Sequence, residues 1–599
     1  MKNSLKIGTC FVCLILLAAL CGCALTGSAT GSAEGYNGTL VLRAERDGDN
    51  FVLTVKKSVE TAGIGSLALD RLLADMNERQ SLAPDVVSGA TQTSAAAVEA
   101  ATKAVKALGM DAQALAERVN FNEVLEKEYD CDVLVIGAGG AGLTTAIAAA
   151  ERGAKVIVLE KMGVAGGSTA RSDGKIMAAG TSVQKDALIV DSSSSLGSFL
   201  FSYAYDDADS TRVLDLAQHT AANLDLLTKL GVRFSQKLLA TYPGQEPTRV
   251  HLVTSSDGSA GGGYLIEPLL RAANAYGVTI LYETQAVELL STAAFTVTGA
   301  RARETGGSIV NVHADATVLA TGGYDRDAEL FFSLAGADTE KAVSMTALGS
   351  TGDGVGLAKS VGGAVIDGAP IATLKDYYAD TDGSCGLLVT PKGARFCNED
   401  ARDFTVSGRL FEAGGGYAYA VFDAKSATGK VKSAAANGYV YEADTLEALA
   451  SALGAPALVS TVDSYNKLCA AGEDTQFGKS ASYLKAIETG PFYAVPYLPT
   501  VYGTTGGLLT NISCAVVQAD GDAIEGMYAA GELINGVYFD EEFPGFGASL
   551  AQVIETGRLA GEHAASYAGS VQAKRAAQQL ENEANEEAPL EEAKYKGYY

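Results

Sequence analysis

The sequence is poor in the residues that bind redox metals. It has only four histidines, and the five cysteines beyond residue 23 are widely separated, with neither a C-x-x-C pair nor a C-x-x-C-H haem site. These absences argue against a haem, an iron–sulfur cluster, a disulfide framework and a His-rich centre, and we expect no bound metal. Basic residues are also outnumbered by acidic ones, 45 to 71. The resulting net charge of −26 argues against nucleic acid as a partner.

What the sequence does contain is a long and glycine-rich apolar chain. Its 599 residues include 68 glycines and are 47% hydrophobic, which fits several domains built around a large α/β core with many tight turns. The negative charge favours solubility outside the cell. It opposes a polyanionic substrate unless the binding pocket is locally basic.

The first 22 residues have the pattern of a lipoprotein signal peptide. Lys2 and Lys6 precede an apolar run that leads into Leu20-Cys21-Gly22-Cys23, a bacterial lipobox cleaved ahead of Cys23. The run is short for a transmembrane helix, which needs about 20 apolar residues. We therefore expect lipidation at Cys23, a lipid-anchored location on the outer face of the cell membrane, and a flexible Gly/Ser/Ala-rich tether over residues 23–38.

A short polar motif is the most informative feature of the N-terminal region. It reads Asp85-Val-Val-Ser-Gly-Ala-Thr91-Gln-Thr93 and precedes an alanine-rich stretch with strong helix propensity. Thr91 is therefore expected just before a helix N-terminus, where backbone N–H groups favour a phosphate. The small residues ahead of it leave its hydroxyl open to approach. An ordinary Ser/Thr helix cap is the alternative.

The motif resembles the FMN-binding domain of sodium-pumping and Rnf-type redox complexes, in which FMN is joined through its phosphate to a threonine. The resemblance implies covalent FMN at Thr91, with Thr93 as the nearby alternative. It also implies that a flavin transferase attaches the FMN while Asp85 holds a metal or orients the phosphate.

Strands are expected at 39–43 and 51–55 and a helix at 67–77. We assign residues 39–110 to a small α+β FMN-binding domain and residues 111–129 to a helical linker.

A dinucleotide-binding βαβ unit starts near residue 130. A buried strand runs into Gly137-Ala-Gly139-Gly-Ala-Gly142, a helix follows, and a second strand ends at Glu160. This context makes the glycine motif a strong signature of a bound dinucleotide, because the glycines permit the turn, the approach of the pyrophosphate and close helix packing. Glu160 stands where an acid can bind the adenosine ribose. A flavodoxin-like fold without a dinucleotide is the alternative.

Four further segments follow in order: Gly166-Gly-Ser-Thr-Ala-Arg-Ser172, Ala320-Thr-Gly-Gly-Tyr324, Ser350-Thr-Gly-Asp-Gly354 and Met527-Tyr-Ala-Ala-Gly-Glu532. With the βαβ unit they make residues 130–566 resemble the fumarate reductase/succinate dehydrogenase flavoprotein family, in its branch of soluble fumarate and urocanate reductases. The resemblance implies non-covalent FAD. The cofactor-binding residues that it implies are Gly137, Gly139, Gly142, Glu160, Gly167, Ser168, Thr169, Gly322, Gly323, Asp353, Gly531, Glu532, Ser549 and Leu550.

The same resemblance implies the domain order of the large part. A Rossmann-like α/β FAD-binding domain over 130–355 and 496–566 is interrupted by a mobile α+β capping domain over 356–495, which binds substrate. Residues 567–599 form an acidic tail that we expect to be a solvated helix or disordered.

The capping domain carries the candidate catalytic residue. In the family an arginine donates the proton within a segment like Arg395-Phe-Cys-Asn-Glu399-Asp-Ala-Arg402-Asp403. The resemblance implies that Arg402 is this acid, acting as a relay because a guanidinium is hard to deprotonate. A salt bridge from Arg402 to Asp403 or Glu399 is the alternative. The upstream relay arginine of the family is missing, so Asp380 or Asp382 is expected in its place.

Two family residues that hold a substrate carboxylate are also missing. Gly503 stands in the place of the histidine, and no arginine lies between Tyr538 and Leu550, where Glu541 and Glu542 stand instead. Since a bidentate arginine contributes roughly a few kcal/mol to binding a carboxylate, fumarate is a poor candidate substrate. The tentative substrate residues are Tyr378, Tyr502, Gly503 and Tyr538.

Lys375, Tyr377 and Tyr378 in the capping region suggest a larger, aromatic or conjugated enoate. A packing role for the two tyrosines is the alternative.

Together these features predict an extracytoplasmic reductase with two flavins. Electrons from a membrane or extracellular donor enter at FMN, pass to FAD and reduce the C=C bond of a small enoate, similar to urocanate or cinnamate, in anaerobic respiration. One alternative is a ketosteroid-type flavin dehydrogenase, because residues 544–550 resemble its last flavin-binding turn, although Phe543 lacks the phenol found there. The other is a non-enzymatic two-flavin electron-shuttle lipoprotein.

Overall fold

The computed structural model describes residues 26–117, 124–202, 210–241, 245–292, 296–336, 342–539 and 543–595. The predicted lipidation site Cys23 and the acidic pair Glu541 and Glu542 lie outside these ranges. The chain forms two compact units, one made of residues up to 123 with residues 162–164 and the other of the remainder. Within the described ranges, none of the helices is both long enough and apolar enough to cross a membrane.

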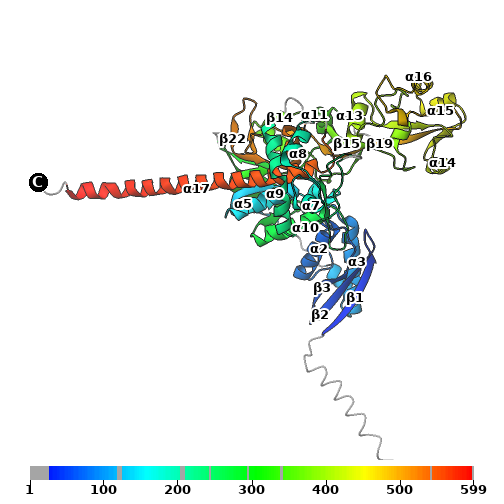
Figure 1. Cartoon of the computed structure of the whole chain (residues 1–599). Helices are drawn as coiled ribbons and strands as arrows, with labels where there is room; N and C mark the ends of the chain where they lie inside the picture. Colours follow the sequence, from blue (N-terminus) through cyan, green and yellow to red (C-terminus); the bar gives the residue numbers. More distant parts are fainter. Residues whose placement is uncertain are drawn as a thin grey trace, which may run out of the picture. The chain divides into compact units, whose positions relative to one another are not determined.

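The N-terminal unit is a three-stranded antiparallel sheet packed against two helices (Figure 1). Its elements are β1 (Thr26–Glu34), β2 (Thr39–Asp47), β3 (Asn50–Lys57), α2 (Gly65–Arg79) and α3 (Thr91–Ala107). Every second residue of β2, from Leu40 to Ala44, is fully buried, as expected for a strand with one face on a core. The predicted α+β fold, its two strands and its helix are therefore confirmed.

The predicted flexible tether is wrong from Thr26 onward. Strand β1 pairs with β2 from end to end. Its small residues have a packing reason, because a Cβ on Gly31 would lie 2.0 Å from the Ala100 carbonyl oxygen of α3. A composition typical of linkers here allows a strand and a helix to approach closely.

The predicted linker over 111–129 is too long at its C-terminal end. A short helix, α4 (Ala112–Ala116), begins where the Asp111 carboxylate accepts hydrogen bonds from the first turn. Strand β4 (Glu126–Ile136) then starts within the predicted linker and pairs with β12 from Glu126. The first half of β4 is half exposed and charged, so it lacks the apolar run by which its start could have been recognised.

The second unit is built on an eight-stranded sheet whose centre is parallel. Strands β9 (Thr279–Leu281), β5 (Val156–Leu159), β4, β12 (Ile309–Leu319) and β22 (Ala523–Ala529) are parallel neighbours. Antiparallel strands β11 (Val297–Glu304) and β10 (Thr284–Ser291) extend it beside β12, and β21 (Ala515–Val517) pairs with β22. Strand β5 and the C-terminal halves of β4 and β12 are mostly apolar, because both of their faces are buried.

Two helices pack tightly on this core. A Cβ on Gly557 of α17 (Ala548–Tyr595) would lie 2.7 Å from the Ala141 carbonyl oxygen of α5 (Gly140–Glu151), so only glycine permits this approach. Figure 1 shows α17 continuing as one helix toward the C-terminus. The predicted acidic tail is therefore helical as far as Tyr595.

The capping part is a second sheet with four helices. Its strands are β13 (Val343–Ser344), β15 (Pro370–Lys375), β16 (Leu387–Val389), β17 (Ala418–Phe422), β18 (Tyr441–Ala443) and β19 (Phe492–Thr504), and its helices are α13 (Asp403–Glu412), α14 (Gly429–Ala436), α15 (Leu446–Leu453) and α16 (Leu458–Ala471). The predicted boundaries at 355 and 495 fall inside α12 (Asp353–Ser360) and β19. Because β19 is continuous, no loop marks the second boundary in the sequence.

Further helices and strands complete the second unit. They are α6 (Gly167–Arg171), β6 (Lys175–Met177), α7 (Ser182–Asp186), α8 (Ser193–Phe201), α9 (Ser210–Lys229), β7 (Arg233–Phe234), β8 (Val250–Thr254), α10 (Gly263–Ala275), α11 (Ala328–Ala335), β14 (Val365–Ile366), η1 (Gly383–Cys385), η2 (Ala481–Tyr483), β20 (Gly507–Leu508) and η3 (Gly531–Val537).

Candidate active site

The predicted cofactor residues gather at one edge of the parallel sheet. Gly137 follows β4, Glu160 follows β5, the segment from Ala320 to Gly323 follows β12, and Gly531 comes shortly after β22. The carboxyl ends of neighbouring parallel strands meet at the same edge, which is where α/β folds bind dinucleotides. The sheet therefore brings together four of the predicted cofactor-binding segments.

The first glycine motif forms a tight cradle. Gly137 has a φ of 108°, and a Cβ there would lie 2.4 Å from the Ala320 carbonyl oxygen. A Cβ on Gly142 would lie 1.8 Å from the Gly137 carbonyl oxygen, so α5 can start this close to β4 only with glycine. At Gly139 the nearest atom would be 4.0 Å away, which leaves the backbone open to a pyrophosphate. These positions fit the dinucleotide half of FAD.

Glu160 and the second glycine segment lie against this loop. The Glu160 side chain is buried and its Oε2 accepts a hydrogen bond from the Ala138 N–H at 2.8 Å. The Gly166 N–H donates to the Ala138 carbonyl at 2.8 Å, and Gly166 and Gly139 form a parallel bridge. Glu160 is thus positioned beside the glycine turn, although its binding to a ribose stays a prediction.

Asp353 is held by an ion pair at the start of α12. Lys161 Nζ lies 2.9 Å from its Oδ2, and the Thr351 hydroxyl donates to its Oδ1 at 2.7 Å. Burial by itself would raise the pKa of Asp353, but the charge and hydrogen bond of Lys161 outweigh it, and the pKa is lowered. Asp353 therefore stays ionised next to the end of β5, and its contact with FAD stays a prediction.

The flavin-side cavity, as we name it, has a volume of about 210 Å³. Five predicted cofactor residues line it: Ser168, Thr169, Glu532, Ser549 and Leu550. The cavity also reaches the start of α17. Gly547, the residue just before this helix, lines the cavity, and a Cβ on it would lie 2.7 Å from the Met177 nitrogen. The FAD segments that are far apart in sequence converge on one side of this cavity, so the flavin ring would lie against that side and leave the opposite wall to the substrate.

Glu532 explains two of the glycines around it. A Cβ on Gly323 would lie 2.1 Å from its Oε1, and a Cβ on Gly503 would lie 2.7 Å from the same atom. The Thr504 N–H donates to that oxygen at 2.8 Å. Gly503 lines neither the flavin-side cavity nor the cavity that contains Arg402, which corrects its prediction as a substrate contact. The carboxyl of Glu532 fills the space that a side chain at position 503 would need.

Burial, with a further contribution from the Asp325 carboxylate, raises the pKa of Glu532 to about 8. An unfolded chain releases this proton near pH 4.5, so between these values the folded protein holds a proton that the unfolded chain has lost. With FAD removed, stability is expected to fall as the pH rises through this window, by up to about 1.4 kcal/mol per pH unit, and to level off above it. Urea unfolding of the protein and of Glu532→Gln across the window checks this, and an equal pH slope in both would refute it.

The other wall of the flavin-side cavity is aromatic and basic. Phe404 packs edge to face on Phe543 and Phe546, with ring centres 5.2 and 5.5 Å apart. Tyr502 and Lys375 complete this wall, and Lys375 Nζ lies 5.2 Å from the centre of the Tyr502 ring. Burial would lower the pKa of Lys375, but the hydrogen bond and charge of the Tyr502 hydroxyl raise it. The prediction of Tyr502 as a residue of the site is consistent with this placement.

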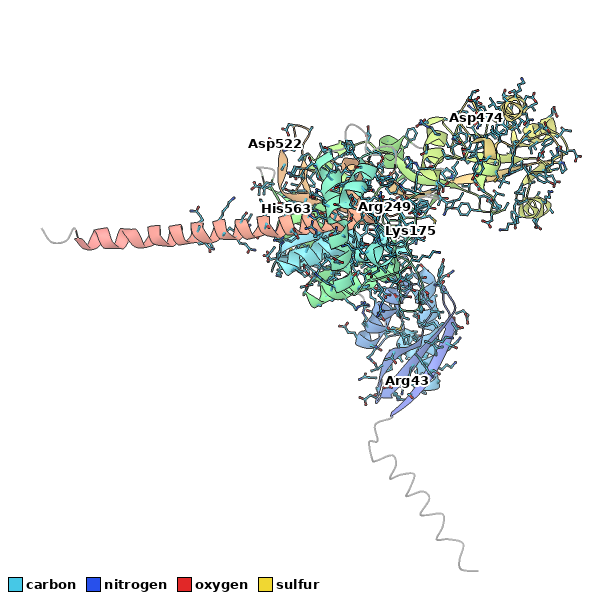
Figure 2. The ribbon with its side chains drawn as sticks, in the orientation of Figure 1. Arg43, Lys175, Arg249, Asp474, Asp522 and His563 are labelled. Carbon is cyan, nitrogen blue, oxygen red and sulfur yellow. The ribbon has the colours of Figure 1, made fainter. Side chains whose placement is uncertain are left out.

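Sequence reasoning missed three residues of this wall. They are Phe404, Phe546 and Lys175. Of the three, Figure 2 labels Lys175. A signal existed for the two phenylalanines, since Phe404 stands two residues after Arg402 and Phe546 lies within the Pro-Gly-Phe-Gly turn.

A second cavity of about 420 Å³, here named the arginine cavity, contains Arg402. Arg402 is the residue that precedes α13, and Asp382 and Asp403 line the same cavity. Both cavities are lined by Phe404 and Phe546, so the two cavities adjoin at these rings. The predicted proton donor therefore lines a cavity next to the flavin-side cavity, and Phe404 and Phe546 form their shared aromatic wall.

Of the two acids predicted to replace the relay, only Asp382 shares this cavity. Asp380 is exposed and paired with Lys430 at the surface, so its prediction as a relay group is wrong. Burial, together with the charge of Asp382, raises the pKa of Asp403. Asp403, which directly follows Arg402 in the chain, therefore holds a proton more readily than an ordinary carboxyl group does.

A buried cluster of charges holds the segment that carries Arg402. Arg395 binds both oxygens of Glu399, at 2.8 and 2.7 Å, and Asp474 at 2.7 Å, while Lys479 Nζ lies 3.5 Å from Glu399. Asp474, labelled in Figure 2, brings the loop after α16 to this segment. Glu399, a predicted alternative partner of Arg402, is therefore already bound by Arg395.

Two predicted substrate residues lie elsewhere. Tyr378 is 45% exposed and stacks on Tyr439 at 5.8 Å between ring centres, so the packing alternative holds for it. Tyr538 is buried next to Phe539 and lines neither of the two cavities. Both were predicted from sequence proximity to site segments, which does not determine the direction of a side chain.

Within the described ranges, one histidine lies in a group that could bind a metal ion. His219 lies with Asp215 and Glu555, and their ligand atoms lie within 4.8 Å of one another. Arg558 and Asn223 already bind the Glu555 carboxylate, each at 2.7 Å. A guanidinium next to the carboxylate opposes a cation, so we interpret the group as an ion-pair network.

In the N-terminal unit, Thr91 and Thr93 have different surroundings. Thr91 is the first residue of α3 and is exposed, and no side chain caps the helix. Thr93 is buried and its hydroxyl donates to Glu60 Oε2 at 2.8 Å. The Ser94 hydroxyl donates to the Ala90 carbonyl and accepts from the Val87 N–H, which fixes the turn ahead of Thr91. Of the two hydroxyls, only that of Thr91 is open to modification.

Two family models match this chain. An FMN-binding domain matches residues 35–106, and an FAD binding domain matches residues 132–550. The matches agree with the positions of the exposed threonine and of the glycine cradle.

Curated relatives include NADH:fumarate oxidoreductase of Klebsiella pneumoniae, 31% identical over 498 residues, or 81% of this chain and 52% of that protein. The chain thus spans about half the length of that relative. Urocanate reductase of Eggerthella lenta is 28% identical over 568 residues, or 90% of this chain and 92% of that protein. A solved 3-ketosteroid-Δ4-(5α)-dehydrogenase of Rhodococcus jostii is 28% identical with a TM-score of 0.60, covering 74% of this chain and 98% of that one.

Proposed function

We propose that this chain, which belongs to the fumarate reductase/succinate dehydrogenase flavoprotein family, is a terminal reductase of small organic enoates. An FMN-binding domain precedes its FAD-binding domain. One observation carries the proposal: the cavity that Arg402 lines adjoins the flavin-side cavity at the shared aromatic wall of Phe404 and Phe546. Reduction of an activated C=C bond needs a proton donor opposite the flavin, and we assign this role to Arg402.

The redox chemistry comes from the bound flavins, which accept electrons at the FMN domain and supply a hydride to one carbon of the double bond. The chain's residues do the rest. Arg402 gives a proton to the neighbouring carbon, and Asp403 and Asp382 restore that proton from the arginine cavity. The shared aromatic wall is apolar, which limits the access of water to the reacting atoms.

Fumarate is an unfavourable substrate for this site. Gly503 leaves no histidine to hold a carboxylate, and the space is filled by the Glu532 carboxyl. A dicarboxylate would bury one charge without a partner, which costs several kcal/mol by rough estimate. We therefore expect an acceptor with fewer charges.

The proposal extends to the electron supply and the location. A flavin transferase attaches FMN to Thr91, which is supported by the exposure of that hydroxyl and the burial of Thr93. A lipid on Cys23 anchors the protein to the outer face of the cell membrane, where a membrane or extracellular donor reduces it during anaerobic respiration. No nucleic acid takes part.

The test is a reoxidation assay on the full-length protein loaded with both flavins. The flavins are reduced with a viologen dye, and enoates including urocanate, cinnamate and fumarate are added in turn. Rapid reoxidation by at least one enoate is expected. If none reoxidises the protein while it exchanges electrons with other carriers, the protein is an electron shuttle instead.

A ketosteroid dehydrogenase is the second candidate. It is favoured by the similarity to the Rhodococcus jostii structure and by the turn from Pro544 to Leu550. Phe543 lines the flavin-side cavity but has no hydroxyl with which to polarise a ketone. Steroid-dependent reduction of a dye, with no reoxidation by enoates, would establish this candidate in place of the reductase.

A further inference from the structure

Lys375 stands apart from the other cations of the flavin-side cavity. Lys175 Nζ is paired with Asp173 at 2.9 Å and lies over the Phe546 ring, 4.2 Å from its centre. Arg171 donates from Nε to the Met345 carbonyl at 3.1 Å. Lys375 has no carboxylate within 4.0 Å in the described part of the chain, and its neighbour is the Tyr502 hydroxyl.

This pair is suited to one carboxylate. An ammonium and a phenol hydroxyl are both hydrogen-bond donors, and both line the cavity from adjacent strands, β15 and β19. A carboxylate placed between them would accept two hydrogen bonds, one of them charge-assisted. The Lys375–Tyr502 pair thus offers what the missing histidine and arginine offer in the family, but from a different position.

The rest of the wall is suited to an aromatic ring. Phe404, Phe543 and Phe546 already pack edge to face, and such clusters accept a further ring in the same geometry. Phe404 and Phe546 also border the arginine cavity, whose 420 Å³ give room for a bulky substituent. A second carboxylate in this position would meet the acids Asp382 and Asp403, and among the described lining residues the one cation there is Arg402, the proposed proton donor.

We propose that the substrate is an aromatic enoate with a single carboxylate, bound through that carboxylate by Lys375 and Tyr502 and through its aryl group by Phe404 and Phe546. This inference rests on the proposed function. The reaction takes two electrons and two protons: the C=C π bond breaks, a C–H bond forms at one carbon from hydride, and a second forms at the other carbon from the Arg402 proton. The electrons come from the external reduced donor, a viologen dye in the test.

The test uses the flavin-loaded full chain, reduced methyl viologen and three acceptors: cinnamate, its uncharged analogue cinnamamide, and fumarate. The wild type is expected to prefer cinnamate over both. Lys375→Met is expected to lower kcat/KM for cinnamate about 10- to 100-fold through KM, while the value for cinnamamide stays within a few-fold. Lys359→Met, at an exposed position on α12, is the matched control and should behave as the wild type.

The outcomes separate the two levels of the proposal. Faster reduction of fumarate or cinnamamide than of cinnamate by the wild type overturns the inference but leaves the reductase in place, as does an unchanged preference in Lys375→Met. No reduction of any enoate overturns the proposed function and the inference with it. If Lys375→Met fails to bind FAD, Lys375→Arg and Tyr502→Phe decide: a retained preference in the first and a reduced one in the second support the carboxylate site.

Discussion

Replacing Arg402 by alanine is expected to lower the rate of enoate-dependent flavin reoxidation about 100- to 10,000-fold, the range that a positioned general acid contributes. Arg402 lines the arginine cavity with Asp382 and Asp403 but not the flavin-side cavity. FAD content and its visible spectrum should therefore stay unchanged. Stopped-flow mixing of the dye-reduced protein with a substrate enoate measures the rate directly.

The control for this experiment is Arg409→Ala on the same helix, α13. Arg409 is exposed and its NH1 lies 2.7 Å from Glu412, and exposed pairs of this kind contribute about 0–1 kcal/mol. The control should therefore reoxidise at the rate of the wild type and melt at nearly the same temperature. Full activity in Arg402→Ala would remove Arg402 from the mechanism.

Replacing Thr91 by valine is expected to abolish covalent FMN and to reduce electron uptake from the physiological type of donor to the background rate. Valine has the shape of threonine without the hydroxyl, so α3 keeps its first residue. FAD remains bound, because its residues lie in the other unit. Mass spectrometry of the peptide that carries residue 91, after expression with a flavin transferase, measures attachment.

Thr93→Val is the matched control for the FMN experiment. It removes the hydrogen bond to Glu60 and should cost about 1 kcal/mol of stability, but it should retain FMN. The opposite pattern, with FMN lost in Thr93→Val and retained in Thr91→Val, would move the attachment site to the buried threonine. Such a result would also require the turn before α3 to open.

Local features of the chain were predictable wherever one backbone conformation demands one residue type. The glycines of the first βαβ unit are examples, since a Cβ on Gly142 would clash with the preceding turn. The pattern of buried residues in β2 likewise appears in the sequence as an alternation. Strand β1 could not be predicted in this way, because its small residues look like a linker until α3 is placed on them.

The site was predictable in its flavin part and much less so in its substrate part. The segments that follow the parallel strands are fixed by the sheet, so motif residues such as Ser168 and Glu532 arrive together. The shared aromatic wall joins Phe404 to Phe546 through tertiary packing that no local sequence pattern indicates. Tyr538 was misplaced for the same reason, because its direction depends on which neighbours fill the space around it.

The contact between Gly503 and Glu532 limits how the specificity of this protein can change. A histidine introduced at position 503 would require the Glu532 carboxyl to move, because a Cβ there would lie 2.7 Å from its Oε1. That movement would break the hydrogen bond from the Thr504 N–H and shift a residue of the flavin-side cavity. A gain of a carboxylate-binding histidine here is therefore coupled to a change in the lining of the flavin-side cavity.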